Sequence, residues 1–296
     1  MKIIITGASG FTGQHACQHF SDARYEVIAI TRKSEVEAKN CEVKYCDLTN
    51  QKAVLELIKA TKPDYVLHLA GQNHVGDSWE DPVSSIQANM MTTIYLLDAV
   101  RKECPSCKVV IVGSALQFDV GNIATLTHPY SLSKTMQVLI AQSWSHLYGL
   151  NVVIAKPSNI VGPGRSNGVC SIFARKIMNM EQDETEQKHL EVSHLGVQRD
   201  FVDVRDVVKG YDVLFQHGKP GEIYDISSGI NHSLGDVTMH LKTFTDVHFN
   251  VKSKQYGEIN NPSPVNPEKI SKLGWKPTIP FSASMKDTLD YYRNLS

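Results

Sequence analysis

A tyrosine and a lysine lie four positions apart in the stretch HPYSLSKTM, residues 128–136. On a helix, Tyr130 and Lys134 would share one face, one turn apart. A free tyrosine has a pKa of about 10, so it is a poor proton donor or acceptor at neutral pH. A neighbouring ammonium lowers such a pKa. The pair is therefore a candidate acid/base group, although the same spacing also occurs on ordinary solvated helices.

Three glycines, Gly7, Gly10 and Gly13, stand between the apolar stretch KIIIT and a helix-like stretch. Their G-x-x-G-x-x-G spacing differs from the commoner G-x-G-x-x-G fingerprint, but the physics is the same. Glycines permit a tight turn, and the helix N-terminus presents N–H groups and partial positive charge to a pyrophosphate. We predict a dinucleotide site here, with Phe11 and Thr12 among its contacts.

The second apolar stretch ends in AITRKS and carries no carboxylate at its end. An acidic residue there would bind a ribose 2′-hydroxyl, whereas an arginine accommodates a 2′-phosphate. Arg32 and Lys33 therefore favour NADP(H) over NAD(H), which stays possible. The alternative is a solvated basic turn, because arginine and lysine are common in loops.

The bulk composition excludes several classes of protein. The 296 residues include 42% hydrophobic residues, enough for one large domain or a domain with a smaller lobe. Thirty basic and 31 acidic residues give a net charge of −1, without the basic excess of a nucleic-acid binder. No run approaches the roughly 18 apolar residues of a membrane helix, and no leader sequence is visible. We expect a cytoplasmic protein that binds neither membranes nor nucleic acids.

Two of the six cysteines, Cys104 and Cys107, form a CxxC in the stretch ECPSCKVV. A zinc or redox role would need a second pair or a thioredoxin-like context, and neither is visible. We interpret the stretch as a turn between a helix and a strand, and we predict no metal site.

Strand-like and helix-like stretches alternate through the first half of the chain. This alternation favours a parallel sheet covered on both faces, and hence an α/β fold with a doubly wound, Rossmann-type sheet. We predict a dinucleotide-binding domain over residues 1–165. Residues 166–296 would form a smaller, mainly substrate-binding lobe that is partly intertwined with the sheet. The expected strands cover residues 2–6, 25–31, 41–48, 64–70, 108–114 and 151–159, and the expected helices cover 12–22, 51–60 and 84–103, with another from 130.

These features together resemble an extended short-chain dehydrogenase/reductase of the NAD-dependent epimerase/dehydratase family, whose members act on nucleotide sugars. The similarity runs along the whole chain, and it is greatest to the GDP-6-deoxy-mannose reductases, which are NAD(P)H-dependent 4-ketoreductases. Besides the glycines, Ser114 and the Tyr130/Lys134 pair, it rests on CDL at 46–48, HLAG at 68–71, PSNIVGPG at 157–164, QRDFVDVRDV at 198–207 and LGWKP at 273–277.

The resemblance implies roles for individual residues. Tyr130 would protonate the substrate carbonyl oxygen, Lys134 would lower the tyrosine pKa, and Ser114 would hold the same oxygen. Arg199 would bind the diphosphate of a nucleotide-sugar substrate, unless it pairs with a nearby aspartate. The other implied contacts are Asp47 and Leu48 at the adenine, Leu69, Ala70 and Gly71 beside the cofactor, and His74, Ser78 and Asn159 at the substrate, although Asn159 is also explained by loop packing.

The residues after Ser114 limit which reactions the site can catalyse. Dehydration needs an acid and a base, which related dehydratases carry directly after the serine or threonine. Ala115 and Leu116 stand there and cannot move a proton. A C3/C5 epimerase would place a cysteine at position 116, although His74 is a possible substitute. Two reactions remain: a 4-ketoreductase using NADPH or NADH, which the basic stretch favours, and a 4-epimerase with bound NAD. A noncatalytic NADP-binding protein is a further alternative.

Three departures from the family pattern leave the nucleotide and the sugar open. Phe118 and Asp119 replace a usual Tyr-Gly, and the loop from 119 to 130 is short. Asn261 stands where an arginine usually helps to hold the diphosphate, and Lys252 or Lys254 would have to compensate. The resemblance also implies a homodimer formed through the helices expected at 82–103 and 130–147.

Overall fold

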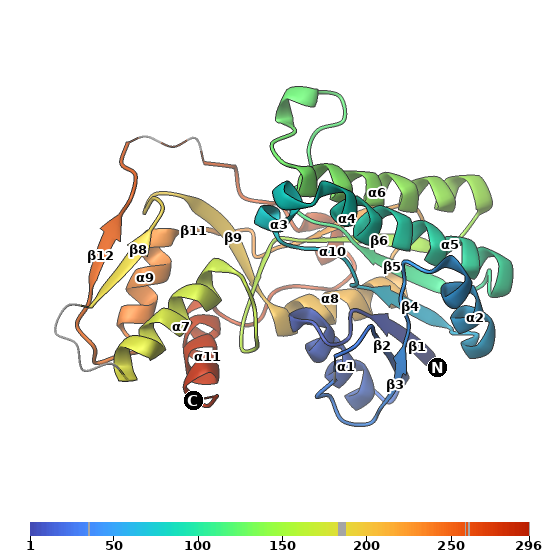
Figure 1. Ribbon diagram of the computed structural model, residues 1–296, viewed down its shortest axis with the longest axis horizontal. Coiled ribbons are helices and arrows are strands. Elements are labelled where there is room, and N and C mark those ends of the chain that lie inside the picture. Colours follow the sequence, from blue (N-terminus) through green and yellow to red (C-terminus); the bar gives the residue numbers. More distant parts are fainter. Residues whose placement is uncertain (35, 183–187, 258, 260, 296) are drawn as a thin grey trace. The chain divides into compact units, whose positions relative to one another are not determined.

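The structure, a computed structural model, describes residues 1–34, 36–182, 188–257, 259 and 261–295 (Figure 1). The chain divides into two compact units. Unit 1 contains Met1–Pro157 and Val208–Tyr224, and unit 2 contains Ser158–Val207 and Asp225–Ser296. The first segment of unit 1 thus ends before the predicted boundary at 165, and residues 208–224, which lie within the predicted second lobe, belong to unit 1.

Unit 1 is built on a seven-stranded sheet in the order β3-β2-β1-β4-β5-β6-β10. The neighbouring strands run parallel, and Ile4 of β1 lies between Ile28 and Val66 of the strands beside it. The predicted α/β fold with a doubly wound sheet is therefore confirmed, with its strand order reversing between β1 and β4. The strands are β1 (Lys2–Thr6), β2 (Glu26–Thr31), β3 (Cys41–Tyr45), β4 (Tyr65–His68), β5 (Lys108–Val112), β6 (Val152–Pro157) and β10 (Ile223–Ile226).

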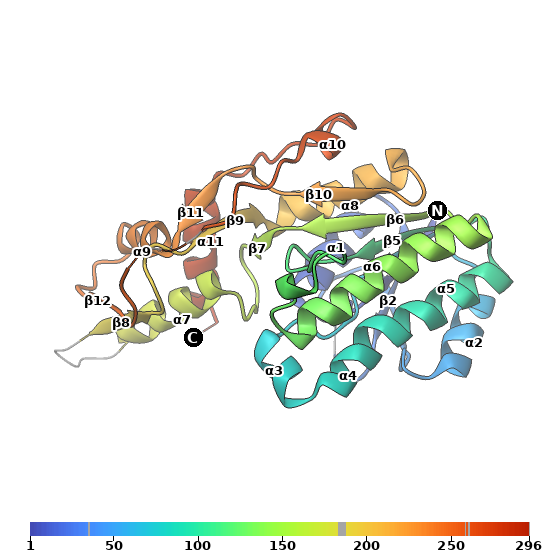
Figure 2. The ribbon, with the colours of Figure 1, turned by 90° about the horizontal axis from the view of Figure 1, so that it is seen from above.

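The sheet carries continuous apolar runs because helices cover both of its faces. Ile3, Ile4 and Ile5 are all fully buried, and each such side chain stabilises the fold by roughly 1.5–3 kcal/mol. Figure 2 shows α5 and α6 side by side on one face. The helices of this part of the chain are α1 (Phe11–Asp22), α2 (Gln51–Thr61), α3 (Val75–Glu80), α4 (Pro82–Ile86), α5 (Thr92–Glu103), α6 (Pro129–Tyr148), the 3₁₀ turn η2 (Ile123–Thr125) and α8 (Val204–His217), which begins in unit 2.

The helix expected over residues 84–103 is interrupted. A π-helical turn, η1 (Gln87–Met91), separates α4 from α5. Asn89, at its centre, is fully buried. Such π turns are rare and frequently occur at functional sites.

Unit 2 consists of small sheets and helices. Its three-stranded sheet pairs β7 (Asn159–Val161) parallel and β11 (Asn231–Ser233) antiparallel to the central β9 (Gln198–Asp203). A second sheet pairs β8 (His189–Val192) with β12 (Asn250–Ser253). Phe173, Leu241 and Met285 belong to one buried apolar cluster. The helices of this unit are α7 (Val169–Gln182), α9 (Leu234–Lys242), α10 (Glu268–Ser271) and α11 (Phe281–Arg293).

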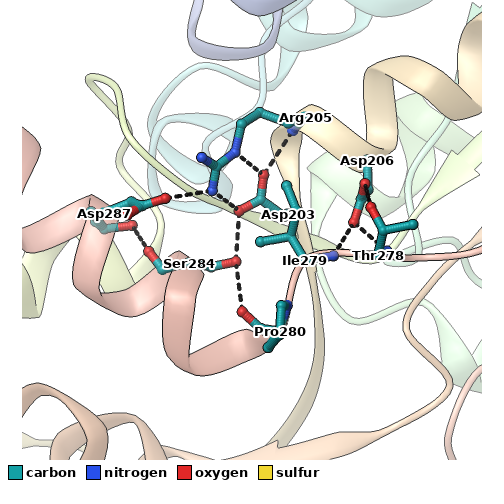
Figure 3. Close-up of polar contacts among 9 residues, drawn as sticks. Asp203, Arg205, Asp206, Thr278, Ile279, Pro280, Ser284 and Asp287 are labelled. Atoms are coloured by element: carbon teal, nitrogen blue, oxygen red, sulfur yellow. Dashed lines mark hydrogen bonds and ion pairs between the residues drawn. The ribbon is translucent and has the colours of Figure 1, made fainter.

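Two aspartates of the QRDFVDVRDV stretch hold unit 2 together, and the first is Asp203 (Figure 3). Its carboxylate accepts hydrogen bonds from the backbone N–H, Nε and Nη2 of Arg205 at 2.8–2.9 Å and from Ser284 Oγ at 2.6 Å. Arg205 also pairs with Asp287 at 2.8 Å. This network ties the first turn of α11 to the end of β9.

The second aspartate, Asp206, is fully buried in the first turn of α8. It accepts hydrogen bonds from Thr278 N at 2.7 Å, Thr278 Oγ1 at 2.8 Å and Ile279 N at 2.8 Å (Figure 3). The indole of Trp275 donates to the Asp206 carbonyl oxygen at 2.9 Å. The QRDFVDVRDV and LGWKP stretches therefore meet in one structural network.

None of the helices in the described ranges is both long and apolar enough to cross a membrane.

Candidate active site

The glycine loop at the start of α1 leaves no room for side chains. Gly7 has φ +69°, in the left-handed region that favours glycine. A Cβ on Gly13 would lie 2.1 Å from the Gly7 carbonyl oxygen. Gly10 N donates to that same oxygen at 3.0 Å, which closes the turn. The close packing of backbone against backbone in this turn therefore requires glycine at positions 7 and 13.

The first turn of α1 fits a pyrophosphate. Gly10 occupies the N-cap, and within the described ranges no side chain caps the helix and no carboxylate lies in the first turn. The N–H groups and partial positive charge of this end of the helix are therefore not neutralised from within the element. The predicted contacts Phe11 and Thr12 lie in this turn, where both are half-buried.

Two basic residues lie near a carboxylate at the carboxyl ends of β2 and β3. Arg32 and Lys33 directly follow β2 and are exposed. Asp47 accepts hydrogen bonds from Thr49 N at 3.0 Å and Thr49 Oγ1 at 2.7 Å. These bonds hold the pKa of Asp47 below its usual value, and the charges of Arg32 and Lys33 contribute further. Leu48, by contrast, is buried in the core beside them.

The segment 69–71 after β4 lies against the glycine loop. A Cβ on Gly7 would come within 2.8 Å of Ala70 N, and Ala70 N donates to Thr6 Oγ1 at 3.1 Å. A Cβ on Gly71 would lie 2.3 Å from Asn89 Oδ1. The structure therefore brings the predicted cofactor residues of the first and fourth strands together at one edge of the sheet.

Ser114, Tyr130 and Lys134 also meet at this edge. Ser114 follows β5, and the other two residues lie in the first two turns of α6, where they are 6% and 7% exposed. Burial raises the pKa of Tyr130, and its interaction with the side chain of Ser114 offsets part of this increase.

The ammonium of Lys134 is bound by two neutral acceptors. Its Nζ donates to the Val112 carbonyl oxygen at 2.7 Å and to Gln137 Oε1 at 2.5 Å. Burial lowers the pKa of Lys134 to about 7. The pKa of Tyr130 is therefore raised in this structure, because burial outweighs the other influences on the phenol, and the action of Lys134 on the tyrosine stays a prediction.

A buried chain of hydrogen bonds connects Lys134 to the π turn. Gln137 Nε2 donates to Thr93 Oγ1 at 2.9 Å, and Thr93 Oγ1 donates to the Asn89 carbonyl oxygen at 2.8 Å. Asn89 Nδ2 donates to Ser133 Oγ at 2.8 Å, and Ser133 Oγ donates back to the Tyr130 carbonyl oxygen at 2.9 Å. Sequence reasoning missed this network, although polar residues on a helix that packs against the sheet are a usable signal.

His68 at the end of β4 is a second missed residue. It is fully buried, with Nδ1 2.8 Å from Thr6 Oγ1, and its Nε2 has no partner in the described part of the chain. Burial, and then the charge of Lys134, lowers the pKa of His68 to about 3. The imidazole is therefore neutral at physiological pH beside the buried ammonium.

The two substrate residues predicted in unit 1 differ in placement. His74 is exposed and caps α3, with Nδ1 2.6 Å from Asp77 Oδ1. Ser78 is fully buried; its hydroxyl donates to the Val75 carbonyl oxygen at 2.6 Å and accepts from Tyr130 N at 3.0 Å. Ser78 is thus placed to hold the backbone of Tyr130, and not to contact a substrate as predicted.

The other two predicted substrate residues lie in unit 2, on adjacent strands. Asn159 on β7 is exposed, and its Nδ2 donates to the Asp200 carbonyl oxygen at 3.0 Å. Arg199 on β9 is half-buried, and its Nη1 donates to the Gln198 carbonyl oxygen at 3.0 Å. The carboxylate of Asp200 binds other donors, including Ser158 Oγ at 2.5 Å.

Asn261, which stands where the family usually has a diphosphate-binding arginine, binds backbone groups. Its Oδ1 accepts from Gln198 N and its Nδ2 donates to the Gly196 carbonyl oxygen, both at 2.9 Å. Lys254, one of the two candidates for a compensating charge, pairs with Glu191 at 2.9 Å. The described residues contain no group of three or more metal-ligating side chains that could hold a metal ion.

Comparison with known proteins agrees with this geometry. Residues 3–227 match the family described as the NAD dependent epimerase/dehydratase family. The GDP-6-deoxy-D-mannose reductase of Pseudomonas aeruginosa is 27% identical over 305 residues, covering 97% of this chain and 96% of that protein. The human dTDP-D-glucose 4,6-dehydratase is 26% identical, covering 99% and 90%.

Solved structures agree over the whole chain. The structure of RMD from Pseudomonas aeruginosa complexed with NADPH has a TM-score of 0.85 at 26% identity, covering 100% of this chain and 99% of that one. The UDP-glucose 4-epimerase of Thermotoga maritima with UDP-glucose also has a TM-score of 0.85, with the same coverage, at 23% identity. The second likeness supports the fold alone.

Proposed function

The chain belongs to the NAD dependent epimerase/dehydratase family, and we propose that it reduces the ketone of a nucleotide-linked 4-keto-6-deoxy sugar with NADPH or, less effectively, with NADH. One observation carries this proposal. Ser114, Tyr130 and Lys134 lie together at the carboxyl edge of the sheet, while the next two residues, Ala115 and Leu116, are exposed and cannot transfer protons. The site thus holds the groups for one proton transfer, and no further acid or base directly after the serine.

Three residues of unit 1 have separate roles in the proposed ketone reduction. The bound dinucleotide supplies the hydride. Ser114 binds the carbonyl oxygen, and Tyr130 donates its phenolic proton to that oxygen as negative charge develops there. Lys134, with a pKa of about 7, is charged in acidic solution and about half protonated at pH 7, and its charged form favours the tyrosinate that remains after proton transfer.

The same account assigns the binding residues. The glycine loop and the N-terminus of α1 hold the pyrophosphate of the cofactor. Gly13 lets the loop pack closely against the first turn of α1, and no side chain of the described part of the chain caps the helix. Arg32 and Lys33 bind a 2′-phosphate. Arg199 binds the diphosphate of the sugar nucleotide, and His74 and Asn159 contact the sugar.

A 4-epimerase with bound NAD is the second candidate, because it uses the same serine, tyrosine and lysine. The exposed pair Arg32 and Lys33 favours the reductase, since a reductive enzyme commonly draws on NADPH. The homodimer expected from the family stays a prediction.

Stoichiometry separates the two reactions. We would incubate the protein with NADPH and nucleotide-linked 4-keto-6-deoxy sugars carrying GDP, UDP or dTDP, and follow the products by mass spectrometry. A reductase consumes NADPH in proportion to product, and the product is heavier by one hydride and one proton. In a parallel incubation with NAD, conversion of a 4-hydroxy nucleotide sugar to a product of unchanged mass, without net NAD consumption, would instead support the epimerase. No turnover of any keto sugar would refute the proposal.

A further inference from the structure

The CxxC stretch between α5 and β5 forms a tight turn. Cys104 is the C-cap of α5, and Cys107 N donates to the Cys104 carbonyl oxygen at 2.9 Å across Pro105 and Ser106. A β-turn brings its first and fourth Cα atoms within about 7 Å, close to the range that a disulfide spans. Proline favours the second position of such a turn. The backbone therefore already holds the two cysteines near bonding geometry.

The two thiols are unequal. The Cys107 thiol donates to the Lys108 carbonyl oxygen at 3.8 Å. The two thiols also interact with each other, which lowers the pKa of Cys104 and raises that of Cys107. The charged neighbours are Lys62, Glu103 and Asp64. Lys62 Nζ donates to the Glu103 carbonyl oxygen at 2.5 Å and to its Oε2 at 2.9 Å, so an ammonium lies at the C-terminal end of α5.

These neighbours divide their effects between the two sulfurs. The charge of Lys62 lowers the pKa of Cys104 further, Glu103 opposes it, and Asp64 raises the pKa of Cys107. The more acidic thiol is also the more accessible one, since Cys104 is 9% exposed and Cys107 is 2% exposed. One thiol is thus suited to attack a disulfide, and the other to resolve the product.

A second pair of cysteines provides an internal contrast. Cys41 at the start of β3 donates through its thiol to the Cys17 carbonyl oxygen at 3.8 Å, and the two thiols also contact each other. Burial raises the pKa of both thiols. Because the thiolate is the nucleophile, this pair reacts more slowly than Cys104 at neutral pH.

The CxxC turn lies apart from the proposed active site in the topology of unit 1. Cys107 directly precedes β5, and Lys62 and Asp64 precede β4. The glycine loop, segment 69–71 and Ser114 follow the opposite, carboxyl ends of parallel strands. Chemistry at the turn would therefore use none of the residues assigned to ketone reduction.

We propose that Cys104 and Cys107 form a redox-active dithiol that exchanges with small-molecule disulfides. The Cys104 thiolate attacks one sulfur of the disulfide and releases the other as a thiolate, which leaves a mixed disulfide on Cys104. The Cys107 sulfur, losing its proton to solvent, then attacks the Cys104 sulfur and releases the second thiol. The protein dithiol is oxidised to an intrachain disulfide while one external disulfide is reduced to two thiols.

Native, fully reduced protein treated with oxidised glutathione tests this proposal. Peptide mapping by mass spectrometry should find a link between Cys104 and Cys107, reversible by dithiothreitol. Cys107→Ser should accumulate glutathione on residue 104, roughly tenfold faster than on Cys41. Cys104→Ser should form neither product, and Cys41→Ser should still form the 104–107 link.

The wild-type map decides the question even where a variant folds poorly. The proposal is overturned if Cys104 and Cys107 stay reduced in native protein while oxidised glutathione is in excess. A link between Cys17 and Cys41 in place of the 104–107 link would also overturn it. So would equal glutathione labelling of residues 104 and 41 in folded Cys107→Ser protein, as judged by circular dichroism.

Discussion

The two units of this protein bury ionic side chains in different ways. In unit 2, Asp203 is paired with Arg205 and also accepts a hydrogen bond from Ser284, so its charge is compensated (Figure 3). In unit 1, Lys134 is buried against a backbone carbonyl and an amide, and no carboxylate in the described ranges pairs with it. Burial therefore holds the pKa of Lys134 at about 7.

This difference indicates a structural role for Asp203 and a chemical role for Lys134. A buried ion with a full set of partners mainly fixes geometry, and removing one partner is costly. Burying an ion without a countercharge costs free energy, because the ion loses its hydration. Ionisable groups whose pKa values are shifted in this way are frequent at functional sites. The neighbouring buried His68, with its pKa of about 3, stays neutral and so leaves a single charge in that core. We therefore expect substitutions of the buried ions in the two units to have opposite effects on stability.

Replacing Lys134 should have the largest effect. In Lys134→Met we expect turnover of the keto sugar to fall by roughly 10²-fold or more, because the tyrosinate loses its nearby positive charge. Stability at neutral pH should rise, because the buried ammonium is gone. NADPH oxidation and urea unfolding measure the two changes, and Lys52→Met, at an exposed position of α2, is the control.

The same variant carries a pH signature. The folded pKa of Lys134 is lowered, so between about pH 7 and its unfolded value the unfolded chain binds more protons. The stability of the wild type should therefore rise with pH in that window, by up to about 1.4 kcal/mol per pH unit from this group. The advantage of Lys134→Met should shrink accordingly, and an advantage that stays constant to pH 10 would contradict the buried-charge account.

Replacing Asp203 should have the opposite signature. Asp203→Asn leaves Arg205 without its main countercharge, and we expect the free energy of unfolding to fall by roughly 2–4 kcal/mol. Urea unfolding measures the loss, with the exposed Asp246→Asn as the matched control. If Asp203→Asn kept full stability but lost turnover, the architectural role of this pair would be refuted.

Exposed cations should matter less than either buried ion. In Arg32→Ala we expect NADPH to bind roughly tenfold more weakly, with little change for NADH, because only NADPH carries the 2′-phosphate. Fluorescence titration with both cofactors measures the ratio, and Lys39→Ala, another exposed position before β3, serves as the control. Equal losses for both cofactors would remove the argument for NADP(H).

We expect the smallest effect from substitutions of Gln137, the side chain that accepts a hydrogen bond from Lys134. Gln137→Glu gives Lys134 the carboxylate partner that unit 2 gives its buried charges. The pKa of Lys134 should rise, and the alkaline limit of turnover should move up by about one pH unit or less. Gln137→Leu, which cannot accept a hydrogen bond, should move that limit in the other direction. Identical pH profiles for both variants would show that Gln137 does not set the charge of Lys134.

Sequence patterns predicted the parts of this molecule that follow from periodicity and topology. The alternation of strand-like and helix-like stretches predicted the parallel sheet, because helices that connect parallel strands cover both faces of the sheet. The family resemblance assigned the glycine loop, segment 69–71 and Ser114 to one site, and they lie at one edge because parallel strands end at the same edge of a sheet.

The sequence did not reveal which polar residues are buried. Asn89, Thr93 and Gln137 lie on helices where polar residues usually face solvent, yet all three are fully buried around Lys134. The π turn follows no propensity rule that we applied. The position of Ser78 was also missed, because its contact with the backbone of Tyr130 joins residues 52 positions apart.

The central claim is that Tyr130 protonates a ketone oxygen as hydride is delivered. Single-turnover NADPH oxidation with a nucleotide-linked 4-keto-6-deoxy sugar, compared between the wild type and Tyr130→Phe, tests it most directly. We predict a fall in rate of roughly 10³-fold with NADPH affinity unchanged. A Tyr130→Phe rate close to that of the wild type would contradict the account.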